Sequence, residues 1–188
     1  MENNLDNTHE MKSGGDSLLS NALKFGLYTS AAYILVSLLF YVLDVDKTSW
    51  VQYLVFLVLI AGIVLGIIQF RDRHSGGFLS YGKSLSTGVL ISLVVGLIMA
   101  VYIYLFMTFF DPGQIEEMAE MAEQKLVDQG MTDEEIDQAM VVARKFMSPV
   151  FSAISSVFTM TFGGTVISLI AAAFLKKNDE SFEGAFKQ

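Results

Sequence analysis

The stretch that decides the fold is SLSTGVLISLVVGLIMAVYIYLFMTFF, residues 84–110, which contains no Asp, Glu, Lys or Arg. Three further windows share this property, and they are Phe25–Leu43, Val51–Phe70 and Phe146–Leu175. A membrane hydrocarbon core about 30 Å thick requires roughly 20 apolar residues in a helix, and each window meets this length. Helices are expected rather than strands, because no alternating pattern of a membrane barrel is present. The sequence therefore predicts an all-α, polytopic membrane protein with four transmembrane helices, at about residues 25–43, 50–70, 84–110 and 149–175.

The composition of the whole chain agrees with this interpretation. Of the 188 residues, 53% are hydrophobic and 17% are charged, the mean hydropathy is +0.50 and the formal net charge is −8. Soluble domains carry about 25% charged residues, and nucleic-acid binders need a basic surface, so neither class fits. The chain has no cysteine and only two histidines, which argues against thiolate and histidine metal sites. We expect no cofactor, no bound metal and no nucleic-acid partner.

Lysine and arginine lie unevenly on the two sides of the predicted spans. One side holds eight of them, namely Lys12, Lys24, Arg71, Arg73, Lys83, Lys176, Lys177 and Lys187. The other side holds four, namely Lys47, Lys125, Arg144 and Lys145. By the positive-inside rule, both termini are expected in the cytoplasm. We therefore predict a disordered cytoplasmic tail at 1–22, the transmembrane domain at 23–177 and a second cytoplasmic tail at 178–188.

The connection between the third and fourth spans is acidic and has a helical pattern. It carries ten acidic and three basic residues between Asp111 and Met147. Asp111-Pro112 is typical of a helix N-cap followed by proline at the first helical position, and Gly130 is typical of a helix end. Thr132 and Glu135 have the spacing of a capping box, which opens a second helix. We expect an acidic helical hairpin at 112–147, whose apolar stripes pack on each other or on the bilayer surface.

Two metal-binding interpretations of this segment are less favoured than a solvated acidic surface. Glu116, Glu120 and Glu123 share a helix face that could collect a divalent cation, but the acidic loop pattern of calcium sites is absent. Methionines at 118, 121, 131, 140 and 147 could ligate a soft metal, but their spacing places most of them in the apolar stripes. We expect neither a calcium site nor a copper site.

Residues 77–84 read GFLSYGKS, which matches the phosphate-binding pattern G-x-x-x-x-G-K-[ST] letter for letter. That pattern works between a buried strand and a helix, whereas here a membrane span is expected on both sides, so nucleotide hydrolysis is not expected. A loop entering a helix still offers free amide groups and the positive end of the helix dipole. Arg71, Arg73 and Lys83 add positive charge and are possible contacts for anionic lipid headgroups. The alternative is an ordinary positively charged cytoplasmic loop.

The charge-free windows contain no Asp, Glu, Lys, Arg or His but many small residues. Coupled transport, voltage sensing and catalysis inside a membrane nearly always use an ionisable group, so we expect neither an enzyme nor a coupled transporter. Small residues recur at every fourth position, which allows helix backbones to approach closely. The residues expected to pack helices together are Gly62, Gly66, Gly88, Ser92, Gly96, Ala100, Gly163 and Gly164. Whether they join helices of one chain or of several chains stays open.

Several motifs, taken in order between the four spans, resemble the membrane family known as domain of unknown function 4199. They are GGFLSYG at 76–82, FDP at 110–112, QGMTDEEIDQAM at 129–140 and FMSP at 146–149. The resemblance covers about Leu23 to Lys177. It implies a four-helix integral inner-membrane protein, typical of bacteria of the Bacteroidota group, with no established activity and no assigned site residue. In the family the position matching Lys83 is often Gln or Glu, which argues further against nucleotide binding.

These observations favour a non-enzymatic accessory or scaffold subunit of a membrane complex. Its expected partners are the lipid bilayer and either another membrane protein or further copies of this chain. The alternative is a small oligomeric channel or facilitator for an uncharged or lipid-like substrate. The oligomeric state and the identity of copurifying proteins distinguish the two, because both functions are compatible with spans that lack charge.

Overall fold

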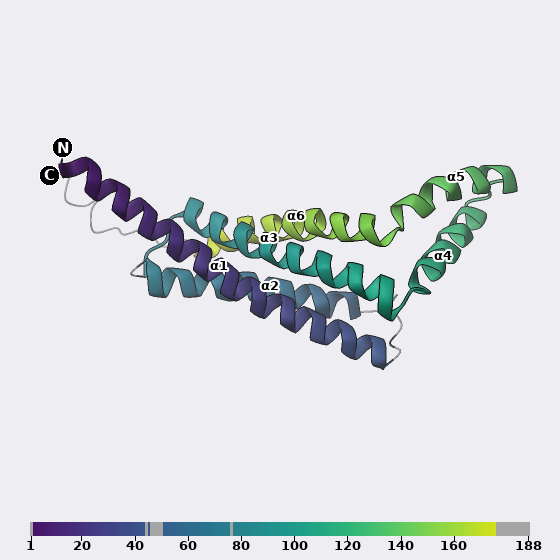
Figure 1. The fold of residues 1–188 in the computed structure, drawn as a ribbon, viewed down its shortest axis with the longest axis horizontal. Helices are drawn as coiled ribbons and strands as arrows, with labels where there is room; N and C mark the ends of the chain where they lie inside the picture. The colour runs from purple at the N-terminus through teal and green to yellow at the C-terminus, as the bar shows by residue number, and fades with distance from the viewer. Residues whose placement is uncertain (1, 44, 46–50, 76, 176–188) are drawn as a thin grey trace. The chain divides into compact units, whose positions relative to one another are not determined.

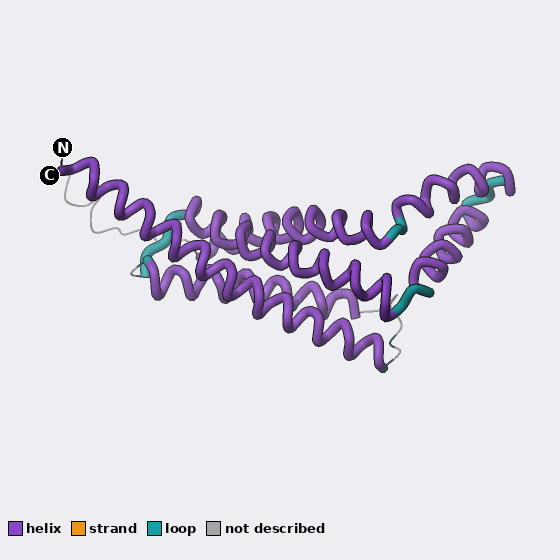
Figure 2. Tube along the Cα trace, in the orientation of Figure 1, coloured by secondary structure: helices purple, strands orange, loops and turns teal. Residues whose placement is uncertain are grey.

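The computed structural model describes residues 2–43, 45, 51–75 and 77–175, and this part of the chain is all-helical (Figures 1 and 2). Its elements are, in order, α1 Glu2–Val42, α2 Val51–His74, α3 Tyr81–Leu105, the short π-helix η1 Phe106–Phe110, α4 Gln114–Asp128, α5 Asp133–Phe146 and α6 Pro149–Leu175. Short loops join most of them, as expected where neighbouring helices run in opposite directions.

Four segments are long and apolar enough to cross a membrane, namely Ser17–Val42, Tyr53–Arg73, Tyr81–Phe110 and Pro149–Leu175. They contain the four charge-free windows almost completely, so the prediction of four span-like helices is confirmed. The first segment begins earlier than the predicted residue 25, because Leu18, Leu19 and Ala22 extend the apolar stretch. Lys24 is tolerated there because a lysine can bury its methylene stem while its ammonium group reaches water.

Residues 2–16 belong to α1, whereas the sequence predicts a disordered tail at 1–22. The apolar segment that follows supplies a ready helix, and extending an existing helix is much easier than nucleating a new one. The composition of residues 2–16 does not itself favour a helix, because most of them are Asn, Asp, Gly, Ser, Thr or His. The second tail, expected at 178–188, lies outside the described residues.

The chain divides into two compact units. The first comprises Met1–Val95 and Met160–Gln188, and so holds α1, α2, the first part of α3 and the last part of α6. The second comprises Gly96–Thr159, with the rest of α3, η1, α4, α5 and the first part of α6. In the first unit, α1 and α2 lie side by side, and Ile63, Ile67 and Ile91 are fully buried (Figure 1). In the second unit, Ala119, Ile136 and Met140 form a small core of their own.

The end of α3 widens into the π-helical turn η1. The Asp111 backbone N–H donates to the Phe106 carbonyl at 2.9 Å, which closes this turn five residues back. Asp111 therefore ends one helix instead of opening the next, and α4 begins at Gln114 with Gly113 as its N-cap. The prediction that Asp111 caps α4 with Pro112 at its first position is wrong, because η1 extends α3 to Phe110.

Candidate functional site

Small residues bring three helices close together in the first unit. A Cβ atom added at Gly88 of α3 would overlap the Ser168 side chain of α6, and one added at Gly164 of α6 would overlap Ser92 of α3. The arrangement is reciprocal, since each helix contributes one glycine and one serine. Ile63 of α2 lies 3.2 Å from both of these Cβ positions, so α2 closes the same contact from its side.

The serine hydroxyls in this contact are satisfied within their own helices. Ser92 Oγ donates to the Val89 carbonyl at 2.9 Å, and Ser168 Oγ donates to the Gly164 carbonyl at 2.5 Å. Both serines are fully buried. The contact between α3 and α6 therefore rests on close packing, as is usual where lipid removes the hydrophobic drive between helices.

Two glycines of α2 accommodate α1. A Cβ atom at Gly62 would overlap Thr29, and one at Gly66 would meet Phe25 of α1 and Ile91 of α3. Asn21 adds a polar contact that the sequence analysis does not identify: its buried side-chain Nδ2 donates to the Gly66 carbonyl at 3.0 Å. Gly26 is a second contact residue that the sequence pattern does not reveal, because a Cβ atom there would overlap Val94 of α3. The spacing of Gly26 and Ser30, four residues apart, is the only sequence signal for this contact.

Three further small residues are expected to pack helices together, and they differ in how much of each is buried. Gly96 is buried and Ala100 is half-buried, both on α3. Gly163 is expected to pack a helix, yet apart from its chain neighbours and the nearby backbone of α6, no described atom lies within 4 Å of a Cβ atom built there. Adjacent residues of a helix point about 100° apart, so Gly164 takes the face toward α3 and Gly163 cannot share it.

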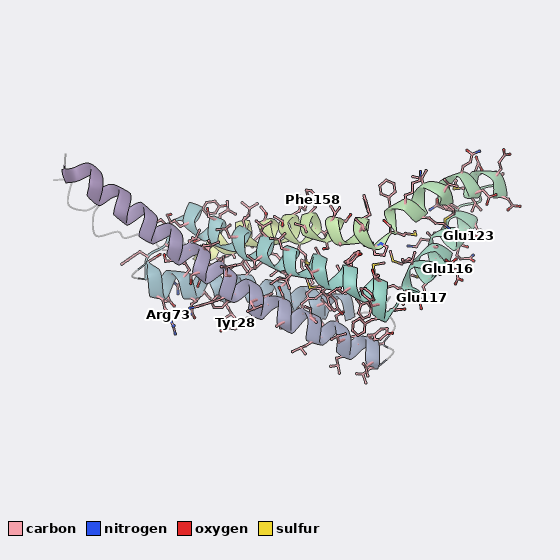
Figure 3. All side chains as sticks on the ribbon, viewed as in Figure 1. Tyr28, Arg73, Glu116, Glu117, Glu123 and Phe158 are labelled. Atoms are coloured by element: carbon pink, nitrogen blue, oxygen red, sulfur yellow. The ribbon has the colours of Figure 1, made fainter. Side chains whose placement is uncertain are left out.

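The loop between α2 and α3 holds the positively charged residues suggested for lipid contact. Arg71 Nε pairs with Asp72 Oδ1 at 2.8 Å, which partly neutralises it. Arg73 and Lys83 are exposed, and Figure 3 shows the Arg73 side chain pointing away from α2. Gly77 has a φ of +85°, and its N–H donates to the Arg71 carbonyl at 3.0 Å, closing the end of α2.

The same loop lacks the surroundings of a nucleotide site. Long apolar helices lie on both sides of it, as expected, in place of a strand and a helix. Ser84, which matches the magnesium-binding serine of the phosphate pattern, is fully buried. The Ser84 side chain is thus enclosed, whereas the neighbouring Lys83 is exposed.

In the second unit, α4 and α5 pack against each other through the core of Ala119, Ile136 and Met140. Partly buried residues complete it, and these are Ala122, Leu126, Met131, Ala143 and Met147. Gly130 ends α4 as predicted: its φ is +77°, and its N–H donates to the Val127 carbonyl at 2.9 Å. Met131 N–H donates to the Leu126 carbonyl at 3.3 Å, which completes the usual glycine-ended helix stop.

The capping box predicted at Thr132 and Glu135 is present at the start of α5. The Glu135 carboxylate accepts from the Thr132 backbone N–H at 2.9 Å and from the Thr132 hydroxyl at 2.8 Å. These two hydrogen bonds lower the pKa of Glu135, because both stabilise its charged form. The bond from the Thr132 backbone has the larger effect and the bond from its hydroxyl the smaller. These bonds tie the turn after Gly130 to the first residues of α5.

A bidentate ion pair joins the first turn of α4 to the last turn of α5. Arg144 Nη1 and Nη2 donate to the two carboxylate oxygens of Glu116 at 3.3 and 3.2 Å. The hydrogen bonds and the charge of Glu116 raise the pKa of Arg144. Among the described residues, no group of three or more His, Cys, Asp or Glu could hold a metal ion. Glu116 is engaged by Arg144, and Figure 3 shows Glu116 and Glu123 along α4.

A protein-family model matches residues 24–177, which include α2, α3, α4, α5, α6 and most of the apolar part of α1. The family is described as a protein of unknown function, DUF4199. The chain belongs to this family. The resemblance seen in the loop and α4–α5 motifs is confirmed, and the DUF4199 match leaves out only residues at the two ends. No curated protein and no solved structure matches the chain.

Proposed function

We propose that this DUF4199 protein is a multi-pass protein of the bacterial inner membrane, with both termini in the cytoplasm, that serves as a non-enzymatic accessory subunit of a membrane complex. Four span-like helices and the two-to-one distribution of Lys and Arg support this placement. In this orientation α4 and α5 form an acidic helical hairpin outside the membrane, on the side opposite the termini.

The composition and packing of the spans argue against a coupled ion or proton transporter. The reciprocal Gly88–Ser168 and Gly164–Ser92 contacts fill the space between α3 and α6, and their hydroxyls bond to their own helices. No Asp, Glu, Lys, Arg or His lies in the charge-free windows, where proton and ion pathways nearly always place one. A role in holding a partner makes no demand for such a group.

The observation that carries the proposal is the outward surface of α4. Met121 and Val127 are half exposed there, next to the exposed acid Glu120 and the Gln124–Asp128 hydrogen bond. The opposite side of α4 is occupied, because Ala119 and Leu126 pack on α5. The exposed acidic groups on this side of α4 favour a partner with basic groups, because complementary charge steers association.

The proposal is tested by gentle extraction of the tagged full chain from native membranes, followed by mass spectrometry and measurement of the mass of the complex. We expect a second protein in a fixed ratio, lost when Glu120 and Met121 are both changed to Lys. Gln138→Lys, which changes an exposed residue of α5, is the matched control and should keep the partner. A homo-oligomer with no second protein contradicts the proposal and favours the channel or facilitator.

The membrane orientation is tested separately, since the chain contains no cysteine of its own. A single cysteine introduced at Val127 should react with a membrane-impermeant maleimide added to intact spheroplasts. A single cysteine at Lys83 should react only after the membrane is opened. The reverse pattern would place the termini outside the cytoplasm.

A further inference from the structure

A row of exposed apolar side chains runs from α6 onto α5. Val142, Phe146, Val150, Ile154 and Phe158 follow one another at every fourth position, and each is between 53% and 72% exposed. Residues four apart lie on the same side of a helix. Figure 3 shows Phe158 pointing away from α6. The outward side of α6 therefore continues across the junction onto the last turn of α5.

The junction that carries this row is short and hydrogen-bonded. Only Met147 and Ser148 separate the two helices. The Met147 N–H donates to the Ala143 carbonyl at 3.1 Å, and the Ser152 N–H donates to the Ser148 carbonyl at 2.9 Å. The rings of Phe146 and Phe151 meet edge to face at 4.7 Å between centroids. The apolar surface therefore has no gap where one helix ends and the next begins.

The same row changes its polarity step by step along α5. Glu134 is followed at four-residue intervals by Gln138, Val142 and Phe146, and all four are exposed. A change from charged to polar to apolar groups is expected along a helix that passes from water into the membrane interface. Exposed Lys145 follows Val142 by three residues, which is the distance of helix neighbours. Its flexible stem can take the ammonium group to lipid phosphates.

At the end of α3, which leads into α4, the exposed apolar row does not continue past the end of the helix. On α3, the exposed row of Leu97, Val101 and Leu105 ends with Phe109, and Asp111 and Pro112 follow at once. The change to polar residues there coincides with the end of the helix. On α5, by contrast, exposed apolar residues continue beyond the helix break, away from the span.

We propose that Val142–Phe146 of α5 lies in the headgroup region of the bilayer, with Lys145 at the lipid phosphates. The inference rests on the proposed placement of α6 across a membrane. The bilayer then covers the row from Val142 onward, rather than from Pro149, where the span-like helix begins. Glu134 and the turn at Gly130 remain in water, so the membrane surface fixes how α5 leaves the bilayer.

Single-cysteine scanning tests this proposal directly, because the chain has no cysteine to remove. Cysteine is placed in turn at Gln138, Val142, Phe146, Ile154 and Phe158, and a nitroxide spin label is attached. The full chain is reconstituted into vesicles of phosphatidylethanolamine and phosphatidylglycerol. Collision rates are then measured with oxygen, which concentrates in lipid, and with a water-soluble nickel chelate. Circular dichroism of each variant checks that the helices are intact.

We expect the ratio of oxygen to nickel collisions to rise along the row. Each step of four residues advances about 6 Å along a helix axis, and the interfacial layer on each side is itself several ångströms thick. Gln138 should be fully accessible to nickel, Val142 partly, Phe146 weakly, and Ile154 and Phe158 almost not at all. Gln138 is the matched control, since it shares the row, the helix and its exposure.

Three results would contradict this picture in different ways. Equal, water-like values at Gln138, Val142 and Phe146 overturn the proposal, although Ile154 and Phe158 remain in lipid. Low collision rates with both reagents at Val142 and Phe146 also overturn it, because they indicate a covering protein or second copy. Water-like values at Ile154 and Phe158 refute the membrane placement of α6, and hence the proposed function.

A second measurement uses a variant without any label. Lys145→Gln should lower the retention of phosphatidylglycerol by the purified protein, compared with Gln138→Lys, which adds a charge about two turns farther from the bilayer than Lys145. Equal phosphatidylglycerol retention by the wild type and Lys145→Gln removes the phosphate contact from the proposal.

Discussion

Gly88 of α3 and Ser168 of α6 lie so close that a Cβ atom added to the glycine would come within 2.7 Å of the serine Cβ. Gly164 and Ser92 make the same contact in reverse. A Cβ atom is fixed to the backbone, so no rotation of a side chain can relieve an overlap there. A larger residue at either glycine must push the two helices apart, and this makes the pair of contacts a sensitive point of the first unit.

Gly164→Ala should therefore destabilise the protein, although alanine favours helices more than glycine does. The added methyl group meets Ser92 Cβ and Oγ, with Ile63 on its other side. Overpacking of a close contact costs about 1–3 kcal/mol, and this exceeds the gain in helix propensity. Unfolding of the detergent-solubilised protein by increasing sodium dodecyl sulfate, followed by circular dichroism, measures the change.

Gly163→Ala is the matched control for this prediction. It makes the same chemical change one residue away, where the new methyl group meets no described atom within 4 Å apart from its chain neighbours and the nearby backbone of α6. We expect its stability to equal or slightly exceed that of the wild type. Equal destabilisation by the two variants would mean that Gly164 is not at the helix contact.

Asn21→Leu should lower stability by about 1 kcal/mol, because it removes the buried hydrogen bond to the Gly66 carbonyl. Side-chain hydrogen bonds between membrane helices contribute on average about 0.6 kcal/mol and at most about 1.7 kcal/mol. The same unfolding titration measures the loss. Ser20→Leu is the control, since Ser20 is exposed on the preceding position of α1. A stability of Asn21→Leu equal to that of Ser20→Leu would show that the bond does not hold α1 on α2.

Local sequence sufficed for some of these features and not for others. Gly130 and the Thr132–Glu135 box were predictable because each depends on residues within one turn of the helix end. Which of Gly163 and Gly164 faces α3 depends on the rotation of α6, and no local pattern states it. The Asn21–Gly66 bond joins residues 45 apart in the chain, and only the packed helices bring them together.

Acidification should weaken the start of α5. The folded-state pKa of Glu135 is lowered by Thr132, so the capping box stabilises the fold at neutral pH. That contribution is lost as the pH falls through the lowered pKa of Glu135, when the carboxylate gains a proton. Carbon-13 NMR of the labelled side chain should give a Glu135 midpoint that moves upward in Thr132→Ala. The Thr132→Ser variant keeps the hydroxyl and should leave the midpoint in place. An unchanged midpoint in Thr132→Ala would show that the hydroxyl does not bind the carboxylate.

Exchange of the two charges that join α4 to α5 should preserve their packing, whereas reversal of one charge should not. Glu116→Arg places two guanidinium groups together, and the amides at the start of α4 should then exchange their hydrogens a few-fold faster. Adding Arg144→Glu restores an opposite pair and should restore slow exchange. Both side chains are more than half exposed, so the effect should be small and should fade in 1 M salt, where charges are screened beyond about 3 Å. Equal exchange in the single and double variants at low salt would mean that the Glu116–Arg144 pair does not hold the two helices. In that case the core of Ala119, Ile136 and Met140 alone would hold α4 on α5.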